Sequence, residues 1–270
     1  MRDEPRAFVR LRALVAACLL ALSLPLPATA AAPEFGFEVV AFHPHDRRVW
    51  TQGLLHDGAG DIMWVSGGRY GRSTLRRVEL ASGRVLAERR LPKPLFAEGI
   101  ARVGDEIFQL TWQEQVAVVY DAATLEPRRE FRYDGEGWGL TTLGDELVFS
   151  NGSSELSFRR PSDFAVLRRV EVRDGDTLVA GLNELEAIGG AIFANVHPTP
   201  RIARISPRTG AVTGWLDLSE LVRQVEQRGG AKVNVVNGIA YDPARRRVFV
   251  TGKYWPAIVE IRSPIFVPSD

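Results

Sequence analysis

Gln52-Gly53-Leu54 is the first copy of a pattern that the 270-residue chain repeats four more times, each time with a polar or aromatic residue two places ahead of Leu or Ile. The later copies are Glu98-Gly99-Ile100, Trp138-Gly139-Leu140, Asn183-Glu184-Leu185 and Asn237-Gly238-Ile239. Successive Leu or Ile positions are 46, 40, 45 and 54 residues apart. An internal period of roughly 40–45 residues is typical of β-propeller blades.

Each copy is followed by a turn and then by a run rich in Val, Ile, Phe or Trp, which predicts a second strand. These runs are Ile62–Gly67, Ile107–Trp112, Leu147–Gly152, Ile192–His197 and Val248–Lys253. In the first four repeats a polar turn, such as Ala81-Ser82-Gly83, then separates two more strands. Four short antiparallel strands in each of five repeats predict an all-β, five-bladed propeller.

The two ends of the repeat region are incomplete, and we expect them to complete each other. After Lys253 the fifth repeat has only the strand Ala257–Ile261, whereas Phe35–Phe42 is an unassigned strand near the other end. We predict that this first strand forms the outer edge of the last blade, which closes the ring and leaves no exposed edge. Between strands, Leu216–Gly229 has apolar residues at i, i+3, i+4 and i+7, which predicts a short amphipathic helix.

The first thirty residues have the composition of a secretory signal peptide. Four arginines precede the apolar run Ala13–Leu24, and Ala28-Thr29-Ala30 forms a small-residue cleavage site. A lipoprotein cleavage site at Cys18 is disfavoured because the apolar run continues beyond that cysteine. We therefore expect removal of residues 1–30, one propeller domain over residues 33–270, and a periplasmic or secreted protein without stable membrane insertion.

Composition excludes several classes of function. Lys and Arg number 34 against 33 Asp and Glu, so a net charge of +1 provides no basic field for nucleic acid. Cys18 is the only cysteine, which excludes an intrachain disulfide, a Cys-x-x-Cys metal site and, after signal cleavage, a thiol nucleophile. His43 and His45 have no third ligand nearby, so we assign them to the surface or a loop and predict neither metal nor cofactor. Because a closed ring needs no partner, we expect a monomer.

The repeat also predicts where functional side chains gather. In a propeller the first strand of each blade lines the channel, and the antiparallel second strand returns to the same face. Residues that open the first strands and close the second strands should therefore meet at one mouth. They are Gln52, Glu98, Trp138, Asn183 and Asn237, together with Gly67, Trp112, Gly152, His197 and Lys253. A concave mouth with aromatic walls and a few polar groups is typical of a small-ligand site.

Longer motifs surround these positions in every repeat. They are Trp50-Thr51-Gln52-Gly53-Leu54, Tyr70-Gly71-Arg72-Ser73, Phe96-Ala97-Glu98-Gly99-Ile100, Gln109-Leu110-Thr111-Trp112, Gly135-Glu136-Gly137-Trp138-Gly139-Leu140, Leu182-Asn183-Glu184-Leu185-Glu186, Val236-Asn237-Gly238-Ile239-Ala240-Tyr241 and Val250-Thr251-Gly252-Lys253. In this order, over residues 36–262, the chain resembles the plant and bacterial type of glutaminyl-peptide cyclotransferase, a five-bladed propeller. The resemblance implies conversion of the N-terminal glutamine of peptides or proteins to pyroglutamate with release of ammonia, without a catalytic zinc.

The resemblance also implies catalytic roles. Glu98 would be the general acid/base, and its polar partners would be Gln52, Asn183 and Lys253. The chemistry suits these residues, because one carboxyl group can accept a proton from the attacking α-amine and then deliver one to the departing ammonia. Lys253, with Gln52 or Asn183, would stabilise the oxyanion that develops on the γ-carbonyl.

Substrate binding is assigned to the remaining mouth residues. Trp112 and Trp138 would form the walls of the site with Trp50 at its rim, and we place Asn237 in the same site from its repeat position. His197 stands where the family typically has tryptophan, so an indole wall is replaced by a titratable group.

Two other functions fit the same mouth. A propeller lactonase or esterase would use Ca²⁺ bound by Glu98, Asn183 and Asn237, although Lys253 and two indoles disfavour a divalent cation there. A non-catalytic propeller that binds peptides in the periplasm would retain the site without releasing ammonia.

Overall fold

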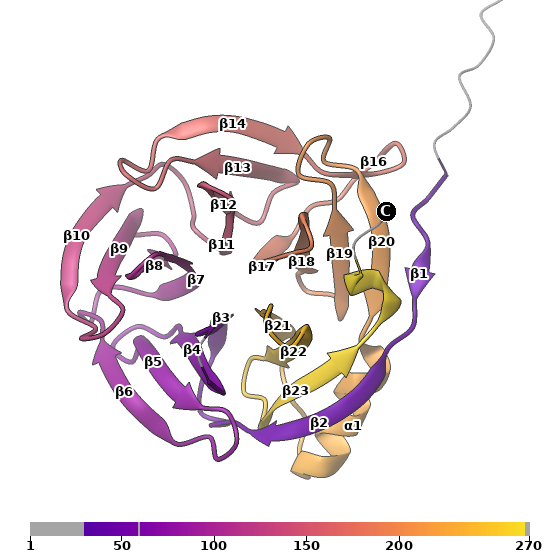
Figure 1. The fold of residues 1–270 in the computed structure, drawn as a ribbon, viewed down its shortest axis with the longest axis horizontal. Helices are drawn as coiled ribbons and strands as arrows, with labels where there is room; N and C mark the ends of the chain where they lie inside the picture. Colours follow the sequence, from indigo (N-terminus) through magenta and orange to yellow (C-terminus); the bar gives the residue numbers. More distant parts are fainter. Residues whose placement is uncertain (1–29, 59, 268–270) are drawn as a thin grey trace, which may run out of the picture.

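Five small antiparallel sheets form a ring around a central channel in the computed structural model, which describes residues 30–58 and 60–267 (Figure 1). Each sheet is one blade, and its strands follow one another from the channel to the outside of the ring. The five-bladed propeller predicted from the sequence is confirmed. The predicted signal peptide, including Cys18, lies outside the described residues apart from Ala30.

The first strand of each blade lines the channel and contains, or directly follows, one copy of the repeated pattern. These inner strands are β3 (Thr51–His56), β7 (Ala97–Val103), β11 (Leu140–Leu143), β17 (Leu182–Ile188) and β21 (Val236–Asp242). Each pairs antiparallel with the next strand along the chain. These second strands are β4 (Ile62–Gly67), β8 (Glu106–Thr111), β12 (Glu146–Ser150), β18 (Ala191–Val196) and β22 (Arg247–Gly252).

Two further strands complete each blade toward the outside. The third strands are β5 (Thr74–Glu79), β9 (Val116–Asp121), β13 (Glu155–Arg159), β19 (Arg201–Ile205) and β23 (Ala257–Arg262). The outer strands of blades I to V are β6 (Val85–Arg90), β10 (Pro127–Arg132), β14 (Val166–Glu171), β20 (Val212–Asp217) and β2 (Glu38–Pro44).

The ring is closed by the start of the described chain, as predicted. Strand β2 pairs antiparallel with β23, from Glu38 opposite Arg262 to Pro44 opposite Ala257, and so becomes the outer strand of blade V. The predicted strand Phe35–Phe42 is in fact divided. Its first part belongs to β1 (Glu34–Phe35), which runs parallel to β20 and extends blade IV to five strands.

A helix connects blades IV and V, but it begins later than predicted. Leu216 still belongs to β20, where it pairs with Ile202, and helix α1 spans Ser219–Gly229. The Asp217 carboxylate accepts a hydrogen bond of 2.7 Å from the Ser219 backbone N–H and so marks the transition. Two small elements lie outside the blades, the hairpin β15 (Arg173–Asp174) with β16 (Thr177–Leu178) and the 3-10 helix η1 (Pro264–Phe266).

The repeated pattern forms a β-bulge at the start of the inner strand. In four blades the pairing with the second strand shifts register across the pattern, between Thr51 and Gly53 in blade I and at the equivalent places in blades II, IV and V. A bulge changes the direction of side chains and is frequent beside active sites. The first residue of each copy lies inside its bulge, namely Gln52, Glu98, Asn183 and Asn237.

The glycine of the pattern is required because adjacent blades approach closely at the channel. A Cβ atom on Gly99 would lie 2.6 Å from the backbone nitrogen of Leu140, and one on Gly139 would lie 1.9 Å from the carbonyl oxygen of Asn183. Such distances leave no room for a side chain. Conserving a glycine at this place in four repeats therefore lets the inner strands converge and positions the preceding residue at the channel mouth.

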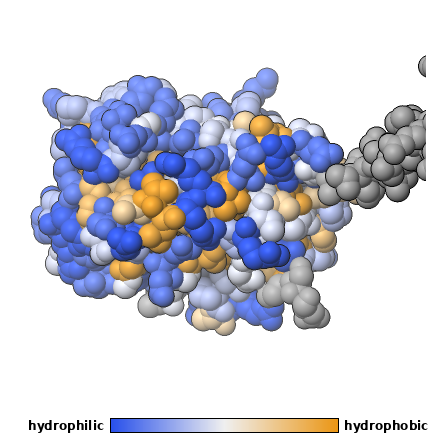
Figure 2. All heavy atoms as spheres, turned by 90° about the horizontal axis from the view of Figure 1, so that it is seen from above, coloured by the Kyte–Doolittle hydropathy of each residue, from blue (hydrophilic) through white to orange (hydrophobic). Residues whose placement is uncertain are grey.

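The side of the outer wall seen in Figure 2 is mostly hydrophilic, with some hydrophobic patches. Exposed apolar residues on the outer strands include Val85 and Leu86 on β6 and Val166 and Leu167 on β14. Among the described residues, no helix has the length and hydropathy needed to cross a membrane.

Candidate active site

One mouth of the channel contains a cavity of about 300 Å³ with aromatic and polar walls. Eight of the nine predicted site residues line it, and the ninth, Asn237, does not. Two lining residues, Arg69 and Phe96, were not predicted. The full lining is Trp50, Gln52, Arg69, Phe96, Glu98, Trp112, Trp138, Asn183, His197 and Lys253.

A hydrogen-bonded chain of three side chains crosses three blades at the base of this cavity. Gln52 Nε2 donates to Glu98 Oε1 at 2.8 Å, and Asn237 Nδ2 donates to Gln52 Oε1 at 2.9 Å. Asn237 also donates to the carbonyl oxygen of Thr51 and is fully buried. The structure thus places Asn237 behind Gln52, where it fixes the orientation of that amide, and not in the cavity wall where we expected it.

Glu98 and Lys253 are an acid and a base in this cavity, and burial disfavours the charged form of each side chain. Burial raises the pKa of Glu98 well above its ordinary value, while the positive charge of Lys253 and the hydrogen bond from Gln52 act in the opposite direction. Burial lowers the pKa of Lys253, and the negative charge of Glu98 opposes that change. Titratable groups with pKa values displaced by burial inside a cavity are typical of catalytic sites.

The two indole walls are held by one carboxylate. Glu136 Oε2 accepts hydrogen bonds from Trp112 Nε1 at 2.8 Å and from Trp138 Nε1 at 2.9 Å, while Gln113 donates to Glu136 Oε1. Burial alone would raise the pKa of Glu136, but these three hydrogen bonds lower it, so the carboxylate remains ionised. Trp112 further packs edge-on against Phe96, with ring centroids 5.6 Å apart.

Another part of the cavity lining carries positive charge over an aromatic face. The Lys253 Nζ atom lies 5.1 Å from the ring centroid of Trp50, and the Arg69 guanidinium lies at the same distance from that ring. Arg69 also donates to the Tyr254 hydroxyl at 2.5 Å, and the Tyr254 ring packs edge-on against Trp50.

The rim residues missed by the sequence analysis have a positional signal. Phe96 lies two residues before Glu98, as Trp50 lies two before Gln52. Glu136 occupies the equivalent place before Trp138. Applying the repeat to this position would have identified Phe96 and Glu136, whereas Arg69 has no matching residue type in the other blades.

Two buried polar atoms at the cavity have no hydrogen-bond partner among the described residues, Oδ1 of Asn183 and Nδ1 of His197. Both residues belong to the cavity wall. The His197 ring lies edge-on to Trp138, with centroids 5.8 Å apart. Burial, helped by the charge of Lys253, lowers the pKa of His197, so the imidazole is neutral at neutral pH. Unsatisfied buried polar atoms in a cavity are available to a ligand.

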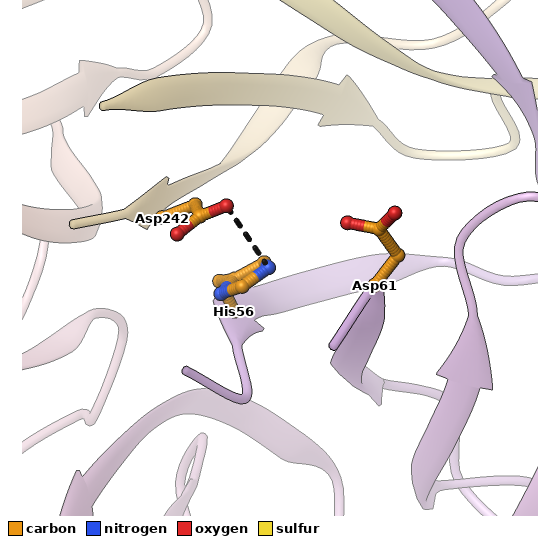
Figure 3. Close-up of side chains that lie close together, drawn as sticks. All are labelled: His56, Asp61 and Asp242. Carbon is orange, nitrogen blue, oxygen red and sulfur yellow. Dashed lines mark ion pairs between the residues drawn. The ribbon is translucent and has the colours of Figure 1, made fainter. Parts of the chain in front are cut away.

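A second cluster of titratable groups, His56, Asp61 and Asp242, lies at the far ends of the strands whose near ends form the mouth (Figure 3). The His56 ring faces Asp242, with Nε2 3.8 Å from the carboxylate. Arg247 already pairs with both carboxylates, and Arg245 pairs with Asp61 at 3.2 Å. Because guanidinium groups neutralise these acids, we assign the cluster to a salt-bridge network that joins blades I and V.

Fold and cavity together define a five-bladed propeller with an enzyme-like site, in which a buried carboxyl group and a lysine line one cavity with aromatic walls. The family model described as glutamine cyclotransferase matches residues 12–263. The chain is 39% identical over 226 residues to a glutaminyl-peptide cyclotransferase of Arabidopsis thaliana, a match that covers 83% of this chain and 70% of that protein. The chain therefore belongs to the glutamine cyclotransferase family.

A solved structure supports the same assignment. The crystal structure of Myxococcus xanthus glutaminyl cyclase superposes with a TM-score of 0.79 at 36% sequence identity, and the match covers 86% of this chain and 98% of that one. The family, the fold and the enzyme class predicted from the sequence are thereby confirmed.

Proposed function

We propose that this protein cyclises the N-terminal glutamine of peptides or proteins to pyroglutamate and releases ammonia, with Glu98 as the general acid/base. The single observation that carries the proposal is the position of Glu98, which is 4% exposed, hydrogen-bonded to Gln52 and placed in one cavity with Lys253 and three tryptophans. Family membership supports the reaction class.

The reaction begins with attack of the neutral α-amine on the carbon of the side-chain amide. Closure of a five-membered ring within one residue is favoured by proximity once the cavity walls hold the side chain folded. The new C–N bond forms as Glu98 takes a proton from the amine, and the carbonyl electrons move onto oxygen. The ammonium group of Lys253 stabilises the resulting oxyanion.

The intermediate then collapses. Glu98 returns its proton to the nitrogen of the original side-chain amide. The bond between that nitrogen and the carbonyl carbon then breaks, and ammonia leaves as the carbonyl re-forms. Burial keeps the pKa of Glu98 high enough for it to hold a proton between these steps. Asn183 Oδ1, which has no hydrogen-bond partner among the described residues, accepts an N–H of the bound glutamine and orients it.

Processing and assembly follow from the sequence. Residues 1–30 act as a signal peptide and residues 33–270 as one catalytic domain, in a periplasmic or secreted enzyme that works as a monomer. The substrate is a peptide or protein with N-terminal glutamine, and the proposed steps use side chains alone.

A coupled ammonia assay on Gln-Ala and Gln-Phe dipeptides, run with and without EDTA, tests the function. We expect ammonia release and mass loss of one NH₃ per peptide, unchanged by the chelator. Activity that disappears in EDTA and returns with Ca²⁺ would support a metal-dependent propeller instead. Binding of the dipeptides without ammonia release would support a non-catalytic receptor.

A further inference from the structure

A second concave site, which we call the basic groove, adjoins the active-site cavity. It has a volume of about 500 Å³, and Trp50 and Arg69 line both the groove and the cavity. The groove runs along blade I beside the loop that follows β4, and Tyr254 belongs to its wall. When the first residue of a peptide fills the cavity, the residues that follow it can therefore reach this groove.

The groove carries an excess of positive charge. Five arginines line it against two acidic residues. These are Arg48, Arg69, Arg72, Arg76 and Arg90, with Asp46 and Glu88.

Three of the five arginines are already paired with the two acidic residues. Arg48 pairs with both oxygens of Asp46 at 2.9 and 3.0 Å, and Arg76 bridges Asp46 and Glu88 at 3.2 and 2.8 Å. Arg90 pairs with Glu88 at 3.0 Å. These three arginines and two acidic residues together leave one positive charge in the groove.

The other two arginines are exposed and have no carboxylate partner within the described part of the chain. Arg69 is held over Trp50 by its hydrogen bond to Tyr254, which orients its guanidinium before any ligand binds. Arg72 lies three residues further along the same loop, and no ion pair or hydrogen bond of its side chain is found among these residues. A guanidinium suits a planar carboxylate, because it can donate two parallel hydrogen bonds.

Two carboxylates also lie near the mouth. The negative charges of Glu114 and Glu136 both raise the pKa of Glu98, although neither residue belongs to the cavity lining. Glu114 is anchored by the Tyr70 hydroxyl at 2.9 Å. Glu114 therefore lies beside the loop that carries Arg69 and Arg72, but neither arginine forms an ion pair with it in the described part of the chain.

We propose that Arg69 and Arg72 form a subsite for a carboxylate located one or two residues after the N-terminal glutamine of the substrate. This inference rests on the proposed cyclisation and adds a preference for acidic peptides. An extended chain advances about 3.3–3.6 Å per residue, so the residue that follows the glutamine meets the cavity rim where Arg69 lies. The carboxylate belongs either to an Asp or Glu side chain or to the free C-terminus of a short peptide.

The test compares kcat/KM for Gln-Glu-Ala-amide and Gln-Gln-Ala-amide. We expect a preference for the acidic peptide of about three- to five-fold at low ionic strength, the range of exposed charge pairs, and its loss in 0.5 M NaCl. Comparing kcat/KM for Gln-Ala as the free acid and as the amide shows whether a C-terminal carboxylate can occupy the subsite in place of an Asp or Glu side chain. Arg72→Gln should abolish the preference. Arg84→Gln, which removes an exposed arginine from the turn at the other face of blade I, should retain it.

A binding measurement keeps the subsite separable from catalysis. Dissociation constants for pyroglutamyl-Glu-Ala-amide and pyroglutamyl-Gln-Ala-amide, followed by tryptophan fluorescence, require no turnover. Tighter binding of the acidic peptide that Arg72→Gln removes supports the subsite, even if ammonia release fails and the proposed function with it. Equal affinities and equal kcat/KM values for both peptides would overturn the subsite while leaving cyclisation intact.

Discussion

Gln52 Nε2 lies 2.8 Å from Oε1 of Glu98, although the two residues are 46 positions apart in the sequence. The two side chains occupy the same place in adjacent blades, inside the bulge at the start of the inner strand. The donor therefore belongs to the blade repeat, and each blade supplies at least one residue of the site. Single substitutions can therefore test separately the charge of the catalytic group, the hydrogen bonds that orient it and the aromatic walls of the cavity.

Glu98→Gln is expected to reduce kcat by at least about 10²-fold, because general acid/base catalysis contributes roughly 10²–10⁴. The amide keeps an oxygen that can accept from Gln52, so the fold should persist. Thermal unfolding measured by circular dichroism provides the control, and its midpoint should not fall. A variant with nearly normal turnover would remove Glu98 from the catalytic step.

Gln52→Leu is expected to move the acid limb of the kcat/KM profile to higher pH. The hydrogen bond from Gln52 lowers the pKa of Glu98, so its loss raises that pKa further and leaves less carboxylate to act as base. A hydrogen bond to a charged group corresponds to a shift of about one pH unit. An unchanged limb would show that the hydrogen bond is not maintained while the enzyme works.

Asn237→Leu provides the matching test for the residue behind Gln52. It removes the donor that fixes Gln52 Oε1 without touching the cavity wall. We expect a smaller shift in the same direction, because Gln52 keeps its contact with Glu98 but loses its fixed orientation. A loss of rate without any change in the pH profile would instead indicate general damage to packing.

Glu136→Ala is expected to raise KM by about ten-fold, because both indoles lose the acceptor that orients them. Glu136→Gln keeps an oxygen acceptor and should retain most of the affinity. Both variants remove a negative charge that raises the pKa of Glu98, so both should move the acid limb to lower pH. Equal KM values for the two variants would contradict a role in orienting the walls.

The sequence was sufficient to predict the fold and most of the cavity, because the period fixes both. Glu98 and Lys253 could be assigned to one mouth since antiparallel neighbours return to the same face. Asn237 obeys the same rule, yet its amide donates hydrogen bonds to Gln52 and to the carbonyl oxygen of Thr51 and so does not line the cavity. Such local hydrogen bonding depends on packing, which the repeat does not predict. The parallel pairing of Glu34 with Trp215 carried no repeat signal and could not be predicted.

Two buried carboxyl groups in the channel were also beyond prediction. Glu184 stands where other blades have glycine, and its two oxygens accept from the backbone N–H groups of Leu54 and Ile239 at 3.0 and 2.8 Å. Glu186, two residues later, accepts from the Tyr241 N–H at 2.8 Å. Glu184 thus joins blade IV to blades I and V, and Glu186 joins it to blade V, a role that depends on the closed ring.

Glu186 gives stability a pH dependence that can be measured. Burial raises its pKa from 4.5 to about 8, so between these values the folded protein holds a proton that the unfolded chain releases. Stability therefore falls as pH rises through this window, by at most about 1.4 kcal/mol per pH unit. Glu186→Gln is neutral at every pH, and its free energy of unfolding should decline less between pH 5.5 and 7.5 than that of the unaltered protein. Parallel declines in urea titrations would show that Glu186 keeps its charge when buried.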